Sequence, residues 1–216
     1  MYYDCIAWDF NGTILDDVHA GMGATNILLA RRNLPQMDSL ATYYRLFGFP
    51  IEDYYTRLGF DFSKESYNDI AAEWMVEYVR LEKAAPLRVG VRETVDRFAN
   101  EGLMQVVLSA SEEGLLRAQL SALGLLSSFD EVRGRDDIHG NDKTALVLAF
   151  RDRNPKRRVL FIGDTDHDAA CARAAGFDCA LIAGGHQSRE RLMATGYPVF
   201  DSCLALADTL AAKGRV

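Results

Sequence analysis

Several features are scarce in this sequence, and each scarcity excludes a class of protein. No stretch approaches the roughly 20 consecutive apolar residues that a membrane-spanning helix needs. The chain also lacks a basic segment followed by an apolar signal region, so we expect a cytoplasmic protein with no membrane partner. The four cysteines include no closely spaced pair, which favours reduced core thiols over a disulfide or metal framework. These cysteines are Cys5, Cys171, Cys179 and Cys203.

Basic charge is scarce as well. Lysine and arginine together number 24 against 31 acidic residues, which gives a net charge of −7 and a sequence pI of about 5.1. Nucleic-acid backbones require a basic surface, so we do not expect a nucleic-acid partner. The hydrophobic fraction of 49% is ordinary for a globular protein with a sizeable core. A chain of 216 residues can hold one large domain, or a medium core with a smaller insertion.

Apolar runs alternate with helical patterns over much of the chain, and this order predicts an α/β fold. Strands that alternate with helices form a parallel sheet with right-handed crossovers. The predicted strands cover residues 5–8, 104–108, 129–132, 159–162, 179–182 and 198–200. The predicted helices cover residues 90–100, 112–123, 143–153 and 168–175, a short stretch near 189, and the chain from 204 onward.

The segment from residue 18 to residue 84 has a different pattern. It contains four helical stretches and no convincing strand, and five of the nine tyrosines lie between Tyr43 and Tyr67. The sequence therefore predicts an all-helical insertion, with hinges at residues 16–18 and 84–87. The predicted core comprises residues 1–17 and 85–216.

Polar residues follow three of the predicted strands. Asp9, Ser109 and Asp164 each stand where an apolar run ends. Because a parallel sheet brings such ends to one edge, we expect these side chains to meet. Asp164 and Asp168 could hold Mg²⁺, which prefers carboxylate oxygens, or could belong to a solvated loop that caps the next helix. Lys143 begins a helix, and a lone lysine there is usually a surface residue, so its role depends on the other positions.

Read together, these positions resemble the motifs of the haloacid dehalogenase superfamily, and specifically its phosphoglycolate-phosphatase-like branch. Residues 9–13, Asp-Phe-Asn-Gly-Thr, are similar to the family's first motif, Asp-x-Asp-Gly-Thr. Ser109 matches the second motif and Lys143 the third. Residues 163–164, Gly-Asp, with Asp168 four residues after the acid, match the fourth. The order of the motifs and the helical insertion after the first one extend the resemblance over nearly the whole chain.

The resemblance implies both an architecture and an activity. The expected fold is a Rossmann-like parallel sheet core with an inserted all-helical cap at residues 18–84. The expected activity is Mg²⁺-dependent hydrolysis of small phosphate monoesters through an aspartyl-phosphate intermediate. The partner would be a small phosphorylated metabolite, and the protein would be a monomer or a homodimer.

The resemblance also assigns residue roles. Asp9 would be the nucleophile, and Lys143 would pair with Asp9 and the phosphate. The resemblance places Mg²⁺ among Asp9, Asn11, Asp164 and Asp168, with Asn11 contributing its backbone carbonyl and Asp168 acting directly or through water. It assigns the binding of the phosphoryl group to Gly12, Thr13, Ser109 and Ala110.

Asn11 departs from the family's first motif, which has a second Asp at this position. That Asp normally protonates the leaving oxygen and later activates water, and an amide cannot shuttle a proton at neutral pH. General acid–base catalysis commonly raises a reaction rate by about 10²–10⁴-fold, so an amide at position 11 is expected to lower the rate of hydrolysis by up to that factor. The sequence keeps three functions open: a slowed phosphatase, a phosphoester-binding pseudoenzyme, and a phosphotransferase or mutase.

Other residues could replace the missing acid, although each has a more ordinary explanation as a hinge, loop or helix-start residue. The nearby titratable candidates are Asp16, Asp17, His19, His167 and His186. A second departure is Ala110, where relatives often carry Asn. A backbone donor at that position would survive the change.

Overall fold

The first apolar run forms a central strand of a parallel sheet in the computed structural model, which describes residues 2–136 and 143–214. Strand β1 (Cys5–Trp8) lies between β2 (Met104–Glu112) and β4 (Val159–Gly163) and is parallel to both. The strand order over the described chain is β3-β2-β1-β4-β5-β6. The outer strands are β3 (Glu131–Arg135), β5 (Asp178–Ile182) and β6 (Val199–Phe200). The α/β prediction with a parallel sheet is confirmed.

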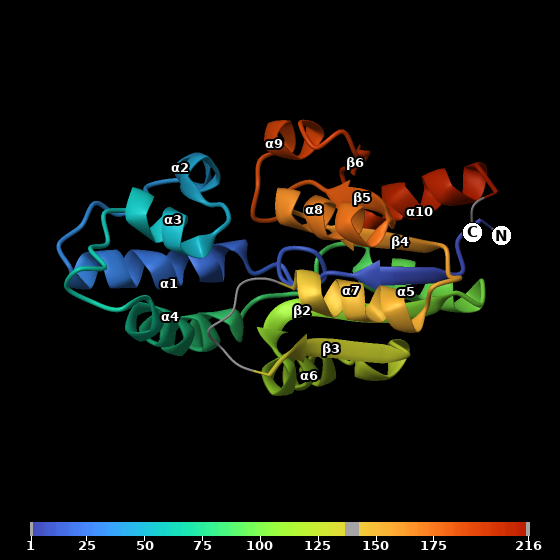
Figure 1. Ribbon diagram of the computed structural model, residues 1–216, viewed down its shortest axis with the longest axis horizontal. Helices are drawn as coiled ribbons and strands as arrows, with labels where there is room; N and C mark the ends of the chain where they lie inside the picture. The colour runs from blue at the N-terminus through green and yellow to red at the C-terminus, as the bar shows by residue number, and fades with distance from the viewer. Residues whose placement is uncertain (1, 137–142, 215–216) are drawn as a thin grey trace.

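Helices cover both faces of this sheet, which explains why its strands are apolar on both sides. Cys5 and Ala7 of β1 pack in one hydrophobic cluster, and Ile6 and Trp8 pack in the other. The first face is covered by α7 (Thr144–Arg153), α8 (Asp166–Ala175) and α9 (Arg189–Met193). The second face is covered by α5 (Val91–Asn100), α6 (Glu113–Ala122) and α10 (Cys203–Ala212). Figure 1 shows these layers around the sheet.

Four helices between β1 and α5 form a group beside the carboxyl ends of the strands, on the left of Figure 1. They are α1 (Val18–Arg31), α2 (Leu40–Leu46), α3 (Ile51–Arg57) and α4 (Tyr67–Glu82). They have a hydrophobic cluster of their own, which includes Leu28, Tyr43, Tyr54 and Ile70. We call α1–α4 the cap. That residues 18–84 are a separate domain stays a prediction.

The two chain segments that join the cap to the core are bonded to each other. Leu15 forms an isolated antiparallel bridge with Leu87, and the Asp16 backbone N–H donates to the Pro86 carbonyl at 2.9 Å. The exit from β1 and the return from the cap therefore lie side by side.

Several predicted element boundaries differ from the structure, many of them by a single residue. Strand β2 does not end before Ser109 but continues to Glu112, because its backbone still pairs with β3, with a register shift between Leu108 and Glu112. Strand β3 spans Glu131–Arg135 rather than residues 129–132. Helix α8 begins at Asp166 rather than at residue 168, because the Thr165 side chain accepts from the Asp168 backbone N–H and caps the helix.

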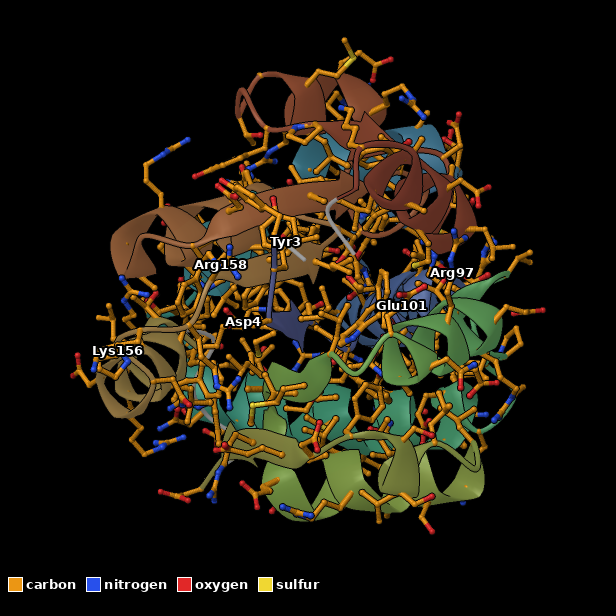
Figure 2. All side chains as sticks on the ribbon, turned by 90° about the vertical axis from the view of Figure 1, so that its right-hand side faces the viewer. Tyr3, Asp4, Arg97, Glu101, Lys156 and Arg158 are labelled. Atoms are coloured by element: carbon orange, nitrogen blue, oxygen red, sulfur yellow. The ribbon has the colours of Figure 1, made fainter. Side chains whose placement is uncertain are left out.

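The end of the core away from the cap is closed by charged and polar contacts. The Tyr3 hydroxyl donates to Asp178 at 2.8 Å, and Asp4 pairs with Arg158 at 3.3 Å. Figure 2 looks at this end of the molecule, where Tyr3, Asp4 and Arg158 are labelled. Strand β1 begins and helix α10 ends on this side, opposite the cap (Figure 1).

All four cysteines are buried, and none forms a disulfide. Their positions in the two hydrophobic clusters agree with the expected core thiols. Among residues 2–136 and 143–214, no helix combines the length and the apolar character needed to cross a bilayer.

Candidate active site

Three buried carboxylates meet at the carboxyl ends of β1 and β4. Asp9 follows β1, Asp164 follows β4, and Asp168 lies in the first turn of α8. One oxygen from each lies within 4.8 Å of the others. The strand register explains the meeting, because Trp8 is paired with Ile162 and the Asp9 backbone N–H donates to the Ile162 carbonyl at 2.8 Å. The structure therefore brings together the acids that the sequence placed at strand ends.

Lys143 inserts its ammonium group among these carboxylates. It is 3% exposed, immediately precedes α7, and contacts Asp9 Oδ1 as well as Asp168 Oδ1, the latter at 2.5 Å. Burial alone would lower the pKa of Lys143, but the carboxylates of Asp168 and Asp9 raise it above its usual value. Lys143 is therefore a buried cation rather than a surface lysine.

Acidic groups outnumber the lysine in this cluster. Burial raises the pKa of Asp9, and the Asp168 and Asp164 carboxylates raise it further against the opposing effect of Lys143. Burial also raises the pKa of Asp164. Three buried acids share one ammonium, and their oxygen atoms are the ligands that Mg²⁺ prefers. The donor set therefore fits a divalent cation.

Asp168 uses its two oxygens differently. Oδ2 accepts from the backbone N–H groups of Asp164 and Thr165 at 3.1 and 2.9 Å, while Oδ1 faces Lys143. Burial would raise the pKa of Asp168, but Lys143 and Thr165 lower it below its usual value. The sequence allowed two interpretations of Asp168, as a helix-capping residue and as a site residue. The two interpretations are therefore compatible.

Asp164 is oriented from two turns. Its Oδ2 accepts from the His186 backbone N–H at 2.6 Å, and its Oδ1 accepts from the Thr13 hydroxyl at 3.0 Å. A Cβ atom on Gly12 or Gly185 would clash with Asp164 Oδ2. Gly185 had no predicted role. The close approach of its backbone to a residue on another strand leaves no signal in the sequence.

The four residues predicted to bind the phosphoryl group lie in two different settings. Ser109 and Ala110 line a cavity above Asp9, and Ser109 Oγ accepts from the Ser111 backbone N–H at 3.1 Å. Gly12 and Thr13 are not among the described lining residues. Their polar groups instead contact acids, since the Gly12 N–H donates to Asp17 Oδ1 at 2.7 Å and Thr13 donates to Asp164.

Asn11 lies in a hydrogen-bond network that joins the core to the cap. Its Nδ2 donates to Asp17 Oδ2 at 2.9 Å and to the Tyr78 hydroxyl of α4 at 2.6 Å, and its Oδ1 accepts from the Ser111 hydroxyl at 2.7 Å. The Tyr78 hydroxyl donates in turn to Asp17 Oδ2 at 2.7 Å. Because an ionised Asp17 only accepts hydrogen bonds, it fixes which end of the Asn11 amide faces it. Sequence reasoning missed Tyr78 and Ser111.

His186 is also bound to this network. Its Nε2 lies 3.2 Å from Asp17 Oδ1, and its Nδ1 lies 2.7 Å from the Tyr43 hydroxyl of the cap. Burial would lower the pKa of His186, but Asp17 raises it to about 9. Reciprocally, His186, Tyr78 and Asn11 lower the pKa of Asp17 against the effect of burial. Both ring nitrogens of His186 are therefore engaged by protein groups.

The other candidates for a replacement acid are placed differently. Asp16 and His19 are exposed at the start of α1, and neither is among the described residues that line the cavity. His167 does line the cavity, and its ring stacks on Phe49 with centroids 4.6 Å apart.

A cavity of about 200 Å³ extends from the acidic cluster into the cap. Its floor contains Asp9, Ser109, Lys143 and Asp164. Its cap wall is largely aromatic and includes Tyr43, Phe47, Tyr54, Trp74 and Tyr78. The acids, the buried lysine and the Asn11 network therefore all face one cavity.

Known proteins share this fold and resemble this sequence. A predicted phosphatase from Clostridium acetobutylicum has the same fold, with a TM-score of 0.79 over 98% of this chain and 100% of that chain at 17% identity. The phosphoglycolate phosphatase of Caulobacter vibrioides is 28% identical over 191 residues, which are 84% of this chain and 79% of the relative. That of Yersinia pseudotuberculosis is 25% identical over 220 residues, covering 97% and 92%.

The family resemblance extends through the cap and most of the core. Residues 6–182 match the family model of haloacid dehalogenase-like hydrolases. This span contains Asp9, Lys143, Asp164 and Asp168. With the strand-end acids assembled as described, the chain belongs to the haloacid dehalogenase-like hydrolase family.

Proposed function

We propose that this enzyme is a Mg²⁺-dependent phosphatase that hydrolyses small phosphate monoesters through a phosphorylated Asp9. The observation that carries the proposal is the buried cluster of Asp9, Asp164, Asp168 and Lys143 on the floor of the cavity. The phosphoglycolate phosphatases among its relatives support the same class of reaction.

Mg²⁺ would be held by Asp9, Asp164 and the backbone carbonyl of Asn11, with Asp168 contributing directly or through water. When bound, it would neutralise phosphate charge and orient the nucleophile. The turns that fix Asp164 and the capping contacts that fix Asp168 keep these carboxylates in place. The protein's own contacts thus hold these carboxylates in place, so metal binding would not need to rearrange them.

The reaction would proceed in two steps on Asp9. Its carboxylate oxygen attacks phosphorus, forming an acyl phosphate as the bond to the leaving oxygen breaks. Lys143 holds Asp9 in position and stabilises charge on the phosphoryl oxygens, while the Ser109 hydroxyl and the Ala110 backbone N–H donate to them. Water then attacks the same phosphorus, releases phosphate and restores Asp9.

A second candidate function is phosphoester binding with little turnover. Asn11 favours this second function. Its amide makes three hydrogen bonds, and it cannot transfer a proton to a leaving oxygen at neutral pH. Both functions require the same phosphate site. They differ in whether ester bonds are broken at a useful rate.

The test is phosphate release from phenyl phosphate with and without Mg²⁺. We expect Mg²⁺-dependent release that Asp9→Asn abolishes, and a phosphorylated protein that can be trapped by rapid acid quench in the wild type. Asp208→Asn on α10 is the matched control, since Asp208 lies on the exposed side of that helix and pairs only with Arg97 among the described contacts. Turnover that survives Asp9→Asn would overturn the mechanism. Mg²⁺-dependent phosphate binding without release would favour the second candidate.

A further inference from the structure

We propose that the leaving group is a flat, uncharged aromatic group, so that the substrate is an aryl phosphate monoester rather than a small anionic alkyl ester such as phosphoglycolate. This inference rests on the proposed phosphatase function. It is carried by the walls of the cavity and, independently, by the contacts of Asn11.

The part of the cavity that would hold the leaving group has no charge on its cap side. The described cap residues that line it, from Gly21 to Tyr78, include no Lys, Arg, His, Asp or Glu. The wall is formed instead by rings and aliphatic groups, among them Phe47, Phe49, Tyr54, Trp74 and Met75. An apolar leaving group would bury its surface there at no desolvation cost.

The Lys and Arg side chains described near the cavity are already engaged and offer no cation to a carboxylate on the leaving group. Lys143 is already shared by Asp9 and Asp168. The Arg88 guanidinium lies outside the described lining residues and donates to the carbonyls of Gly12 and Ala183 at 2.9 and 2.6 Å. Burying a carboxylate without a partner is strongly unfavourable, so phosphoglycolate is poorly matched to this wall.

Two histidines line the core side of the cavity rather than its cap wall. His186 is cationic, but its charge is paired with Asp17 through one ring nitrogen, and the other nitrogen lies against the Tyr43 hydroxyl. His167 presents its ring to Phe49 in a stacked arrangement, with centroids 4.6 Å apart. Both rings add to the flat surfaces of the cavity.

The size of the cavity suits one ring. Its volume is about 200 Å³. An apolar cavity of about 150 Å³ is enough to hold benzene, so this space accommodates one aromatic ring with a phosphoryl group beside it. Stacked pairs already line it, with Trp74 and Tyr78 centroids 4.7 Å apart and Tyr43 and Phe47 centroids 5.1 Å apart. Such surfaces favour a further ring in an offset or edge-to-face arrangement.

The contacts of Asn11 point to the same class of ester by a separate route. Asn11 cannot donate a proton to a departing oxygen, and His186 has both nitrogens engaged elsewhere. An aryl oxygen can leave as the phenolate: the Asp9 oxygen–phosphorus bond forms, the phosphorus–aryl oxygen bond breaks, and the electron pair leaves with that oxygen. The phenolate then takes its proton from water. An alkoxide is a far stronger base and needs a proton during bond cleavage.

The binding part of the inference can be tested without turnover. Calorimetry in the presence of Mg²⁺ compares benzylphosphonate with 3-phosphonopropionate, which replaces the ester oxygen of phosphoglycolate by carbon. We expect benzylphosphonate to bind at least about tenfold more tightly, since ring contacts favour it and the buried carboxylate disfavours its competitor. Trp74→Leu should weaken benzylphosphonate binding, and Val76→Ala on the exposed side of the same helix should leave it unchanged.

A gain-of-function variant supplies the converse test. Met75 lines the cavity from α4, and Met75→Lys would place an ammonium group on the uncharged wall. We expect this variant to reverse the preference toward 3-phosphonopropionate, with Met75→Leu as its control. A wild-type preference for 3-phosphonopropionate would overturn the inference and leave the proposed function standing. If neither phosphonate binds and no ester is hydrolysed with Mg²⁺, the proposed function itself fails.

Turnover kinetics test the argument from the cavity wall and the argument from Asn11 separately. Phenyl and benzyl phosphate both carry a ring, but only phenyl phosphate has an acidic leaving group. We expect phosphorylation of Asp9, measured as kcat/KM, to be about 10²–10⁴-fold faster with phenyl phosphate than with benzyl phosphate, and we expect a much higher KM for phosphoglycolate. Equal kcat/KM values for phenyl and benzyl phosphate would show that another residue supplies the proton and would overturn the Asn11 argument. A low KM for phosphoglycolate would overturn the argument from the cavity wall.

Discussion

At position 11 the amide is matched to its surroundings. Asn11 Nδ2 lies 2.9 Å from a carboxylate oxygen of Asp17, which is itself buried. An aspartate at position 11 would bring two carboxylates to that separation, and one of them would have to keep a proton. Restoring the family's acid by Asn11→Asp is therefore not a neutral exchange of isosteres in this chain.

This proximity predicts energetic coupling between positions 11 and 17. Asn11→Asp should lower the free energy of unfolding more in the wild type than in an Asp17→Asn background, with a coupling of about 0.5–3 kcal/mol. The reason is that an amide at position 17 could donate to the new carboxylate, whereas the native Asp17 repels it. Urea denaturation of the wild type, the two single variants and the double variant measures the coupling, and strictly additive losses of stability would contradict it.

The double variant Asn11→Asp, Asp17→Asn should also hydrolyse benzyl phosphate about 10²–10⁴-fold faster than the wild type, because it carries an acid at position 11.

The carboxylates around Lys143 predict a pH dependence of stability. The pKa values of Asp9 and Asp164 in the folded protein lie above the ordinary 3.8, so ionisation is harder in the folded than in the unfolded state. Without Mg²⁺, their contribution to the free energy of unfolding should therefore fall as pH rises from about 4 toward neutrality. Mg²⁺ binds the ionised forms and should raise Tm more at pH about 8 than at pH about 5. Thermal melts with and without Mg²⁺ check this, with Asp164→Asn as the variant that should flatten the difference. A rise in Tm on adding Mg²⁺ that is equal at both pH values would contradict the prediction.

Among the elements, the turn after β5 is tightly constrained. Gly185 lies against Asp164, and a methyl group there would clash with the carboxylate. Gly185→Ala should destabilise the protein by about 1–3 kcal/mol through overpacking and should weaken Mg²⁺ binding by displacing Asp164. Gly114→Ala is the control, because the nearest atom to its Cβ is the end of the flexible Glu112 side chain. Calorimetric Mg²⁺ titration and denaturation distinguish the two effects. Unchanged Mg²⁺ affinity would show that Asp164 is not positioned by this turn.

The kind and order of the elements were predictable from the sequence, whereas several boundaries were not. The alternation of buried runs with helical patterns reflects burial on both faces of the sheet, which the sequence records directly. The extension of β2 through Ser109 to Glu112 depends on backbone pairing with β3, and polar side chains do not reveal such pairing. The start of α8 depends on which of several adjacent polar residues caps it, and Thr165 does so.

Over the whole molecule, part of the candidate site was predictable from the sequence and part was not. Asp9, Asp164 and Ser109 could be grouped in advance, because parallel strands end at one edge. The contacts of Asn11 with Tyr78 and Ser111 span 67 and 100 residues of sequence. They depend on where the cap sits over the core, and no local pattern encodes that placement. The aromatic cavity wall arises in the same way, from tyrosines whose spacing indicates only helix packing.

The burial of the cysteines predicts how the intact molecule responds to thiol reagents. All four thiols are buried, and burial raises the pKa of Cys5 and Cys203 to about 12, so reactive thiolate is scarce in the native state. Ellman's reagent should detect almost no thiol in the folded protein and all four after denaturation. Their reaction rate at intermediate urea should follow global unfolding. Rapid labelling of one thiol under native conditions would contradict the burial seen here.

The start of β1 and the end of α10 lie on the side of the molecule opposite the cap. The cap, in contrast, joins the core through two adjacent segments near Leu15 and Leu87. A linker attached to either end of the core would therefore leave the cavity uncovered and the cap unhindered. The enzyme can be tethered to a solid support, or fused to another protein at either end, with its substrate access preserved.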